Sequence, residues 1–161
     1  MTVDESFVVS TYVVPFYMSR LDPAEVRQLA ALARAASVDE ILWMVNNAGW
    51  REQRVGASFA LVRTEPAIGP ALLAAIPRTH GTYGLHSLVT AAVLLCAADA
   101  IPVLHTHQQR VNAVGYRGDP GSGFVAAALE HLGADPLHPA TDDDRAQFER
   151  MLQLAEQIRS I

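Results

Sequence analysis

The sequence predicts an all-α fold in which antiparallel helical hairpins stack on one another, with about eight helices and an extended N-terminal arm. Three observations support this prediction. After residue 20, apolar residues recur at the spacing of a helix face through most of the chain. Capping signals separate these runs. One short pattern also occurs three times, which is typical of helical-repeat arrays.

The repeated pattern begins in Trp50–Ile76, which we interpret as two short helices joined by a turn at Thr64–Pro66. Its copies start at residues 57, 90 and 126, so they are offset by 33 and 36 residues, within the range of helical repeats. Each copy aligns a small residue, a turn and an apolar residue that opens the next helix. The small residues are Ser58, Ala91 and Ala127, and the apolar ones are Ile68, Ile101 and Leu137. Chance similarity among alanine-rich helices is the alternative explanation.

Length and composition favour one globular domain that spans residues 1–161. Half of the residues are hydrophobic and 18% are charged, which excludes a disordered chain. The formal net charge of −5 argues against a nucleic-acid partner. Cys96 is the only cysteine, the N-terminus has no basic segment, and no apolar run approaches a membrane span. We therefore expect a cytoplasmic protein without a membrane partner or a cofactor.

Residues 1–20 differ from the rest of the chain because β-branched and aromatic residues are concentrated there. Pro15 is expected to break any regular element, so we predict an arm that packs its aromatic rings on the helices. Residues 22–48 form the first helix pair, since Asp22 with Glu25 and Ser37 with Glu40 match capping boxes. Gly49 is expected to end the second of these helices.

Residues 50–161 hold the repeat-like hairpins and a C-terminal helix. An amphipathic stripe begins at Leu85, and its partner helix is expected to run from about Ile101 to Val114. The glycine-rich segment that follows is expected to be a plain loop, with Ser122 capping the next helix, because it lacks the strand and lysine of a phosphate-binding loop. Thr141, with Asp144 three residues later, caps the final helix.

The polar helix His105–Asn112 is our candidate contact surface, because one face of a helical array usually carries the binding residues. The candidate residues are His105, His107, Gln108, Gln109, Arg110, Asn112, Tyr116 and Arg117. An ordinary solvated helix face is the alternative. We expect no metal here, because residues two apart on a helix face different directions and cannot share an ion.

Arg51 and Arg54 are the second group of candidates, next to Trp50. Two guanidinium groups beside an indole ring could hold a carboxylate or a phosphate. The structural alternative is that Trp50 fills the core between hairpins while both arginines pair with acidic neighbours. No Ser/His/Asp or Cys/His catalytic set is visible, and the apolar surroundings of Cys96 argue against a nucleophile.

Two segments resemble an uncharacterised family of small bacterial proteins. Tyr12–Tyr17 is similar to its YVxPFY segment, and Trp50–Ala57 is similar to its WRExxVGA segment. The resemblance implies a HEAT-like α-solenoid and carries over no catalytic residue. Similar small helical-repeat proteins are immunity partners of secreted bacterial toxins.

The sequence therefore favours a non-catalytic protein-binding module, with an immunity-type role as one form of it. The alternative is a small-ligand-binding protein or an enzyme that uses Arg51, Arg54 or the His105–His107 helix. Self-association into a homo-oligomer is a third option, since the chain is rich in apolar residues.

Overall fold

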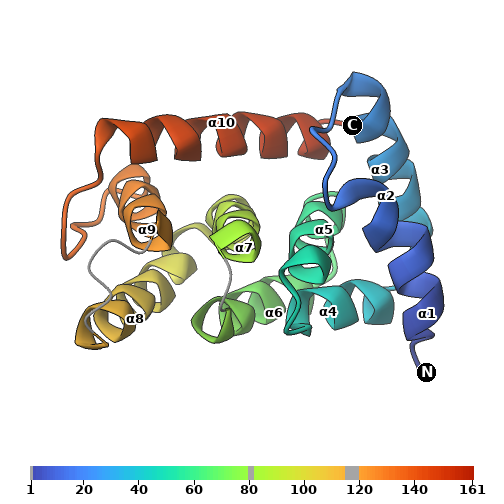
Figure 1. The fold of residues 1–161 in the computed structure, drawn as a ribbon, viewed down its shortest axis with the longest axis horizontal. Helices are drawn as coiled ribbons and strands as arrows, with labels where there is room; N and C mark the ends of the chain where they lie inside the picture. The colour runs from blue at the N-terminus through green and yellow to red at the C-terminus, as the bar shows by residue number, and fades with distance from the viewer. Residues whose placement is uncertain (1, 80–81, 115–119) are drawn as a thin grey trace.

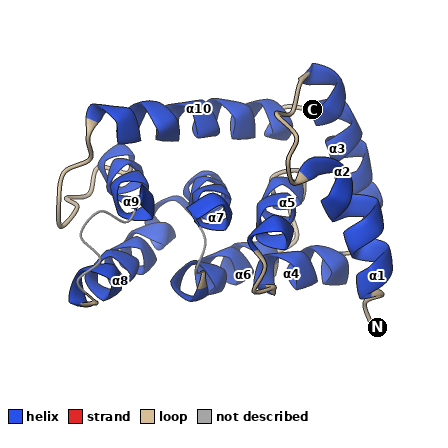
Figure 2. Cartoon of the chain, viewed as in Figure 1, coloured by secondary structure: helices blue, strands red, loops and turns tan. Residues whose placement is uncertain are grey.

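The computed structural model describes residues 2–79, 82–114 and 120–161, and every regular element within these ranges is helical (Figure 2). The predicted all-α class and the number of about eight helices are confirmed. The longer helices are α3 (Pro23–Ala35), α4 (Val38–Asn46), α5 (Trp50–Ala60), α6 (Ile68–Ala75), α7 (Thr82–Cys96), α8 (Ala100–Ala113), α9 (Pro120–His131) and α10 (Asp142–Arg159). The shorter elements are α1 (Glu5–Val8), the π-helical turn η1 (Val9–Val13), α2 (Val14–Phe16) and the 3₁₀ turns η2 (Ile76–Arg78) and η3 (Ala97–Asp99).

The helices form two rows with one helix crossing above them (Figure 1). In this view α4, α6 and α8 form the lower row, and α5, α7 and α9 form the row above it. Helix α10 runs over the second row, where it contacts α9 and α7 and reaches α3. Helices α1–α3 close the end of the molecule next to α4 and α5. Stacked hairpins are compatible with this arrangement, while the repeat relation itself stays a prediction.

The predicted pattern of helix, turn and next helix matches the structure in two of its three copies. Its aligned small residues, Ser58, Ala91 and Ala127, lie on α5, α7 and α9. The first two turns lead into α6 and α8, as expected. The third does not, because Leu137 lies in a linker and the next helix begins only at Asp142. Gly133 ends α9 with φ +74°, and prolines in the linker cannot donate helical hydrogen bonds.

Residues 5–16 are helical, so the prediction of an extended N-terminal arm is wrong. The backbone N–H of Val14 bonds to the carbonyl of Val9, five residues earlier, which widens the turn just before Pro15. A wider turn accommodates a proline ring that would clash with the carbonyl four residues back in a regular α-helix. The aromatic side chains do pack on the other helices, as expected, with Tyr12 and Phe59 ring centroids 5.3 Å apart.

Side-chain caps set the helix starts that the sequence predicts. The three capping boxes are Asp22 with Glu25, Ser37 with Glu40, and Thr141 with Asp144. Gly49 differs from its predicted role, because its φ of −79° makes it the N-cap of α5 rather than a left-handed residue that ends α4.

One window within the stretch 82–113 is long and apolar enough to cross a membrane, the only such window in the part of the chain that the structure describes. This finding differs from our expectation that no apolar run approaches that length. Half of the window is buried inside the protein. The run is also divided, because Ala97 adopts φ +46° between α7 and α8. The fold therefore uses this run as a core helix followed by a second helix.

Candidate functional site

The two distinctive sequence segments meet at the start of α5. Tyr17 ends the YVxPFY-like segment and Trp50 begins the WRExxVGA-like segment, and their ring centroids are 5.9 Å apart at an interplanar angle of 67°. Tyr83, in the first turn of α7, lies 5.4 Å from the Trp50 ring. Three parts of the chain that are distant in sequence thus bring three aromatic rings together.

The guanidinium group of Arg51 places a positive charge beside two of these rings. Its guanidinium carbon lies 4.8 Å from the Trp50 ring centroid and 5.1 Å from that of Tyr17, within the range of cation–π interactions. We call Tyr17, Trp50, Arg51 and Tyr83 the aromatic–arginine cluster. Arg51 is exposed and Tyr83 is 62% exposed, so the cluster lies on the surface. Trp50 is half-buried there, and the expectation that it fills the core is therefore wrong.

Arg54 holds the backbone next to the cluster in place. Its Nη2 donates a hydrogen bond to the backbone carbonyl of Ser19 at 2.9 Å, which fixes the chain that follows Tyr17. Burial lowers the pKa of Arg54, although an arginine stays protonated at neutral pH. Arg51 and Arg54 therefore have different roles: the first faces solvent, and the second positions the backbone.

The helices under the cluster are closely packed. A Cβ atom added to Gly84 would lie 2.6 Å from Oε1 of Gln53 and 3.2 Å from Cα of Trp50, so α7 lies directly against α5. The buried Gln53 amide donates to the carbonyl of Asn47 at 2.9 Å and accepts from the Thr79 hydroxyl at 3.3 Å. This network joins the α4–α5 turn to the segment before α7 and holds Trp50 and Tyr83 in place.

Two of the α8 candidates are inside the protein. His107 and Gln108 are each 2% exposed, so the prediction that they form part of a contact surface is wrong. Oε1 of Gln108 accepts a hydrogen bond from the backbone N–H of Leu137 at 3.0 Å. The side chain of Gln108 therefore ties α8 to the linker after α9.

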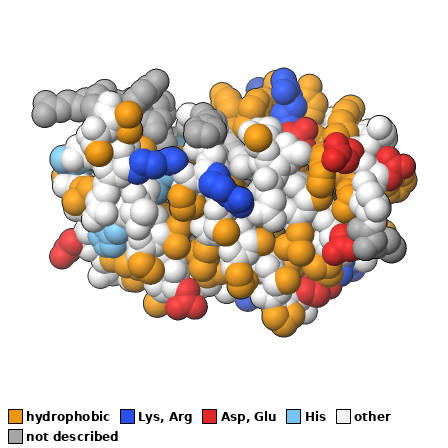
Figure 3. All heavy atoms as spheres, turned by 90° about the horizontal axis from the view of Figure 1, so that it is seen from below, with side chains coloured by type: hydrophobic (Ala, Val, Ile, Leu, Met, Phe, Trp, Pro, Cys, Tyr) orange, Lys and Arg blue, Asp and Glu red, His pale blue; other side chains and the backbone are white. Residues whose placement is uncertain are grey.

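The other α8 candidates remain at the surface. Gln109, Arg110 and Asn112 are exposed, and His105 is half-buried. The Arg110 guanidinium donates to the backbone carbonyl of Pro77, which uses part of its hydrogen-bonding capacity. On the underside, where α4, α6 and α8 lie, charged side chains are scattered among apolar and uncharged ones (Figure 3). The candidates Tyr116 and Arg117 lie outside the described residues.

Three other predictions concern metal binding, a helix cap and a cysteine. Among the residues that the structure describes, no group of three or more His, Cys, Asp or Glu could hold a metal ion. Ser122 lies inside α9, which begins at Pro120, so its predicted role as the cap of that helix is wrong. Cys96 is half-buried, and burial raises the pKa of its thiol.

No protein-family model matches the chain, and comparisons with curated proteins and with solved structures give no significant match. The resemblance of its two segments to a bacterial family therefore stays a prediction.

Sequence reasoning found half of the aromatic–arginine cluster. Arg51 was a candidate, and Trp50 was considered beside it. Tyr17 was noticed only as part of a motif. Tyr83 was missed, because the sequence predicts a loop from Thr79 to Gly84, which contains Tyr83 and precedes the stripe that begins at Leu85. The helix starts earlier than that stripe, at Thr82, and this additional turn brings Tyr83 against Trp50.

Proposed function

We propose that this protein is a non-catalytic protein-binding module and that the aromatic–arginine cluster is the centre of its contact surface. The observation that carries the proposal is a surface group in which Arg51 and Tyr83 are exposed and Trp50 and Tyr17 are half-buried, on closely packed helices. These three residue types are enriched among the few residues that contribute most of the binding energy at protein interfaces. Side chains that are ordered before binding also lose less conformational entropy when a partner arrives.

The cluster favours a partner of particular chemistry. Arg51 is a local positive charge in a chain whose formal net charge is −5. A partner surface would match it by presenting a carboxylate to Arg51, which forms strong charge-assisted hydrogen bonds. An apolar or aromatic side chain beside that carboxylate would pack against Trp50 and Tyr83.

A tagged pull-down from the native host, read by quantitative mass spectrometry, tests the proposal. The variant is Arg51→Ala combined with Tyr83→Ala, whose residues are both exposed, so the melting midpoint should change little. We expect recovery of a stoichiometric partner to fall at least about tenfold, because losing 1.4 kcal/mol of binding energy has that effect.

The matched control is Leu137→Ala combined with Arg150→Ala, which truncates an exposed apolar residue and an exposed arginine elsewhere. The control should retain the partner. Equal recovery with both double variants would place the contact surface elsewhere, and empty beads with the wild type would contradict the binding module itself.

An immunity-type role is the specific form of this proposal, with a bacterial toxin as the partner. Its support is the resemblance of two segments to a bacterial family with HEAT-like repeats, because similar small helical-repeat proteins occur as immunity partners of secreted bacterial toxins. Co-expression with a toxin encoded beside the gene should protect the host, and the cluster variant should abolish that protection while the control variant keeps it.

The alternative function is a small-ligand-binding protein or an enzyme that uses the predicted arginines and histidines. The positions of two of these residues argue against it. Arg54 is held by a backbone carbonyl, and His107 is buried. Neither side chain is placed to receive a ligand together with Arg51 or His105.

A further inference from the structure

A groove opens at the opposite end of α5 from the aromatic–arginine cluster. It has a volume of about 350 Å³ and lies between the α5–α6 turn, the start of α6 and the end of α7. This volume falls in the lower part of the range of small-molecule sites. Its apolar wall is made by Ile68, Leu73 and Leu95, and its polar groups include Glu65, Cys96 and Asp99.

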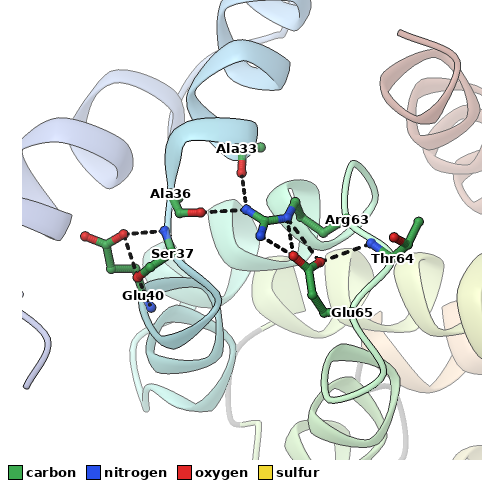
Figure 4. A network of polar contacts seen from close by, with 7 residues as sticks. All are labelled: Ala33, Ala36, Ser37, Glu40, Arg63, Thr64 and Glu65. Carbon is green, nitrogen blue, oxygen red and sulfur yellow. Dashed lines mark hydrogen bonds and ion pairs between the residues drawn. The ribbon is translucent and has the colours of Figure 1, made fainter. Parts of the chain in front are cut away.

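Arg63 lines the same groove, but its positive charge is already satisfied (Figure 4). Its Nε donates to both carboxylate oxygens of Glu65, at 2.9 and 3.1 Å, and its Nη2 forms an ion pair with the same carboxylate. Its Nη1 donates to the backbone carbonyls of Ala33, at 3.0 Å, and Ala36. The Arg63 guanidinium accordingly lowers the pKa of Glu65. An anionic ligand would have to break these contacts.

The rest of the groove is electrostatically negative. Asp99 is exposed, and within the described ranges it has no ion-pair partner. Leu95 and Cys96 belong to the last turn of α7, where backbone carbonyls carry the negative end of the helix dipole. That turn contains no basic residue of its own, although Arg159 donates to the carbonyl of Leu94 at 3.2 Å. Asp99 is also the N-cap residue of α8, whose positive dipole end offsets part of the dipole of α7. The full negative charge of the Asp99 carboxylate is therefore what favours a cation at this end of the groove.

We propose that this groove binds a small organic ammonium ion with an apolar body. The apolar part packs against Ile68, Leu73 and Leu95, and the ammonium group lies between Asp99 and the last turn of α7. The site is independent of the proposed protein-binding function, because the two surfaces lie at opposite ends of α5.

Three probes with the same ring and different charge test this proposal: phenethylammonium, 2-phenylethanol and 3-phenylpropionate. Each is titrated into the full chain and followed by ligand-observed saturation-transfer NMR. We expect the ammonium to bind most tightly and the carboxylate least tightly. The advantage of the ammonium over the alcohol should be about fivefold, as for an exposed ion pair. Asp99→Asn should remove that advantage and leave the affinity for the alcohol unchanged.

A substitution that fills the groove tests the location. A Cβ atom added to Gly69 would lie 3.3 Å from Sγ of Cys96, so the larger side chain of Gly69→Leu would occupy the space between α6 and α7. This variant should lose all three probes. The control is Ala74→Leu, on an exposed position of the same helix, and it should bind as the wild type does.

Amide chemical shifts of the wild type give a readout that does not depend on any variant. Phenethylammonium should shift the amides of Gly69, Cys96 and Asp99 more than those at the start of α5. Equal affinities for the three probes, binding that persists in Gly69→Leu, or shifts centred elsewhere would each overturn the proposal.

Discussion

Gly56 sets the distance between two helices. A Cβ atom added to it would lie 2.7 Å from Cβ of Met44 and 2.9 Å from the backbone nitrogen of Val45. The backbone of α4 therefore lies directly against α5 at this point. This approach explains a glycine within α5, where glycine usually costs about 1 kcal/mol relative to alanine. It also gives a physical reason for the glycine of the WRExxVGA-like segment.

Gly56→Ala should lower the free energy of unfolding by about 1–3 kcal/mol, because the added methyl group forces the two helices apart. Urea denaturation measures the change. The control is Gly69→Ala, also in a helix, where the added Cβ would meet only Sγ of Cys96 at 3.3 Å. The control should stay within about 1 kcal/mol of the wild type. Equal effects of the two substitutions would show that the α4–α5 spacing does not depend on Gly56.

The residues of α8 show why polarity alone predicts the wrong side of the helix for His107 and Gln108. Leu104, His107, Gln108 and Val111 are all buried and follow the i, i+3, i+4, i+7 spacing of one helix face. The polarity of HTHQQRVN predicts a solvated helix face, whereas this spacing predicts that His107 and Gln108 face the core. Residue types therefore predicted hydrogen bonding correctly, as Gln108 shows, but only the periodicity counted from Leu104 could predict the direction of its side chain.

At the scale of the element, the starts of α3, α4 and α10 were predictable because a capping box is set by four consecutive residues. The N-terminal segment was not, because its β-branched residues suggested an extended chain while its packing decides the structure. Val8, Tyr12 and Phe16 are buried and recur every four residues, which places them on one face of a helix. The aromatic–arginine cluster could not be predicted as a unit, since it needs contacts between Tyr17, which follows α2, and residues of α5 and α7.

Tyr12→Ala tests whether residues 5–16 are part of the core. Tyr12 is 4% exposed and contacts Phe59 of α5, so its truncation should cost about 3–5 kcal/mol of unfolding free energy, as for other large aromatic residues. Phe7→Ala is the control, because Phe7 also contacts Tyr12 but is 46% exposed, and it should cost much less. Both are read from chemical denaturation. A Tyr12→Ala variant as stable as the wild type would mean that the segment is a detachable arm.

At the scale of the whole molecule, α10 determines whether the stacked helices can unfold one unit at a time. In a simple repeat array each unit contacts only its neighbours, so unfolding can proceed unit by unit. Here α10 contacts α9 and α7 and reaches α3, which joins both ends of the molecule. Its buried face includes Phe148, which packs on Phe124 at 5.3 Å between ring centroids, and Ile158 near its other end.

This link predicts that the protein unfolds as one unit. Trp43 on α4 and Trp50 on α5 are the two tryptophans, so their fluorescence follows the N-terminal half, while far-UV circular dichroism follows all helices. The two denaturation curves should superimpose, as a two-state transition requires. Phe148→Ala should lower the free energy of unfolding by about 3–5 kcal/mol and move both curves to lower denaturant concentration together, although the substitution lies far in sequence from either tryptophan. A fluorescence curve that stays in place while the dichroism curve moves would show that the two halves fold independently and that α10 covers the second row without coupling it.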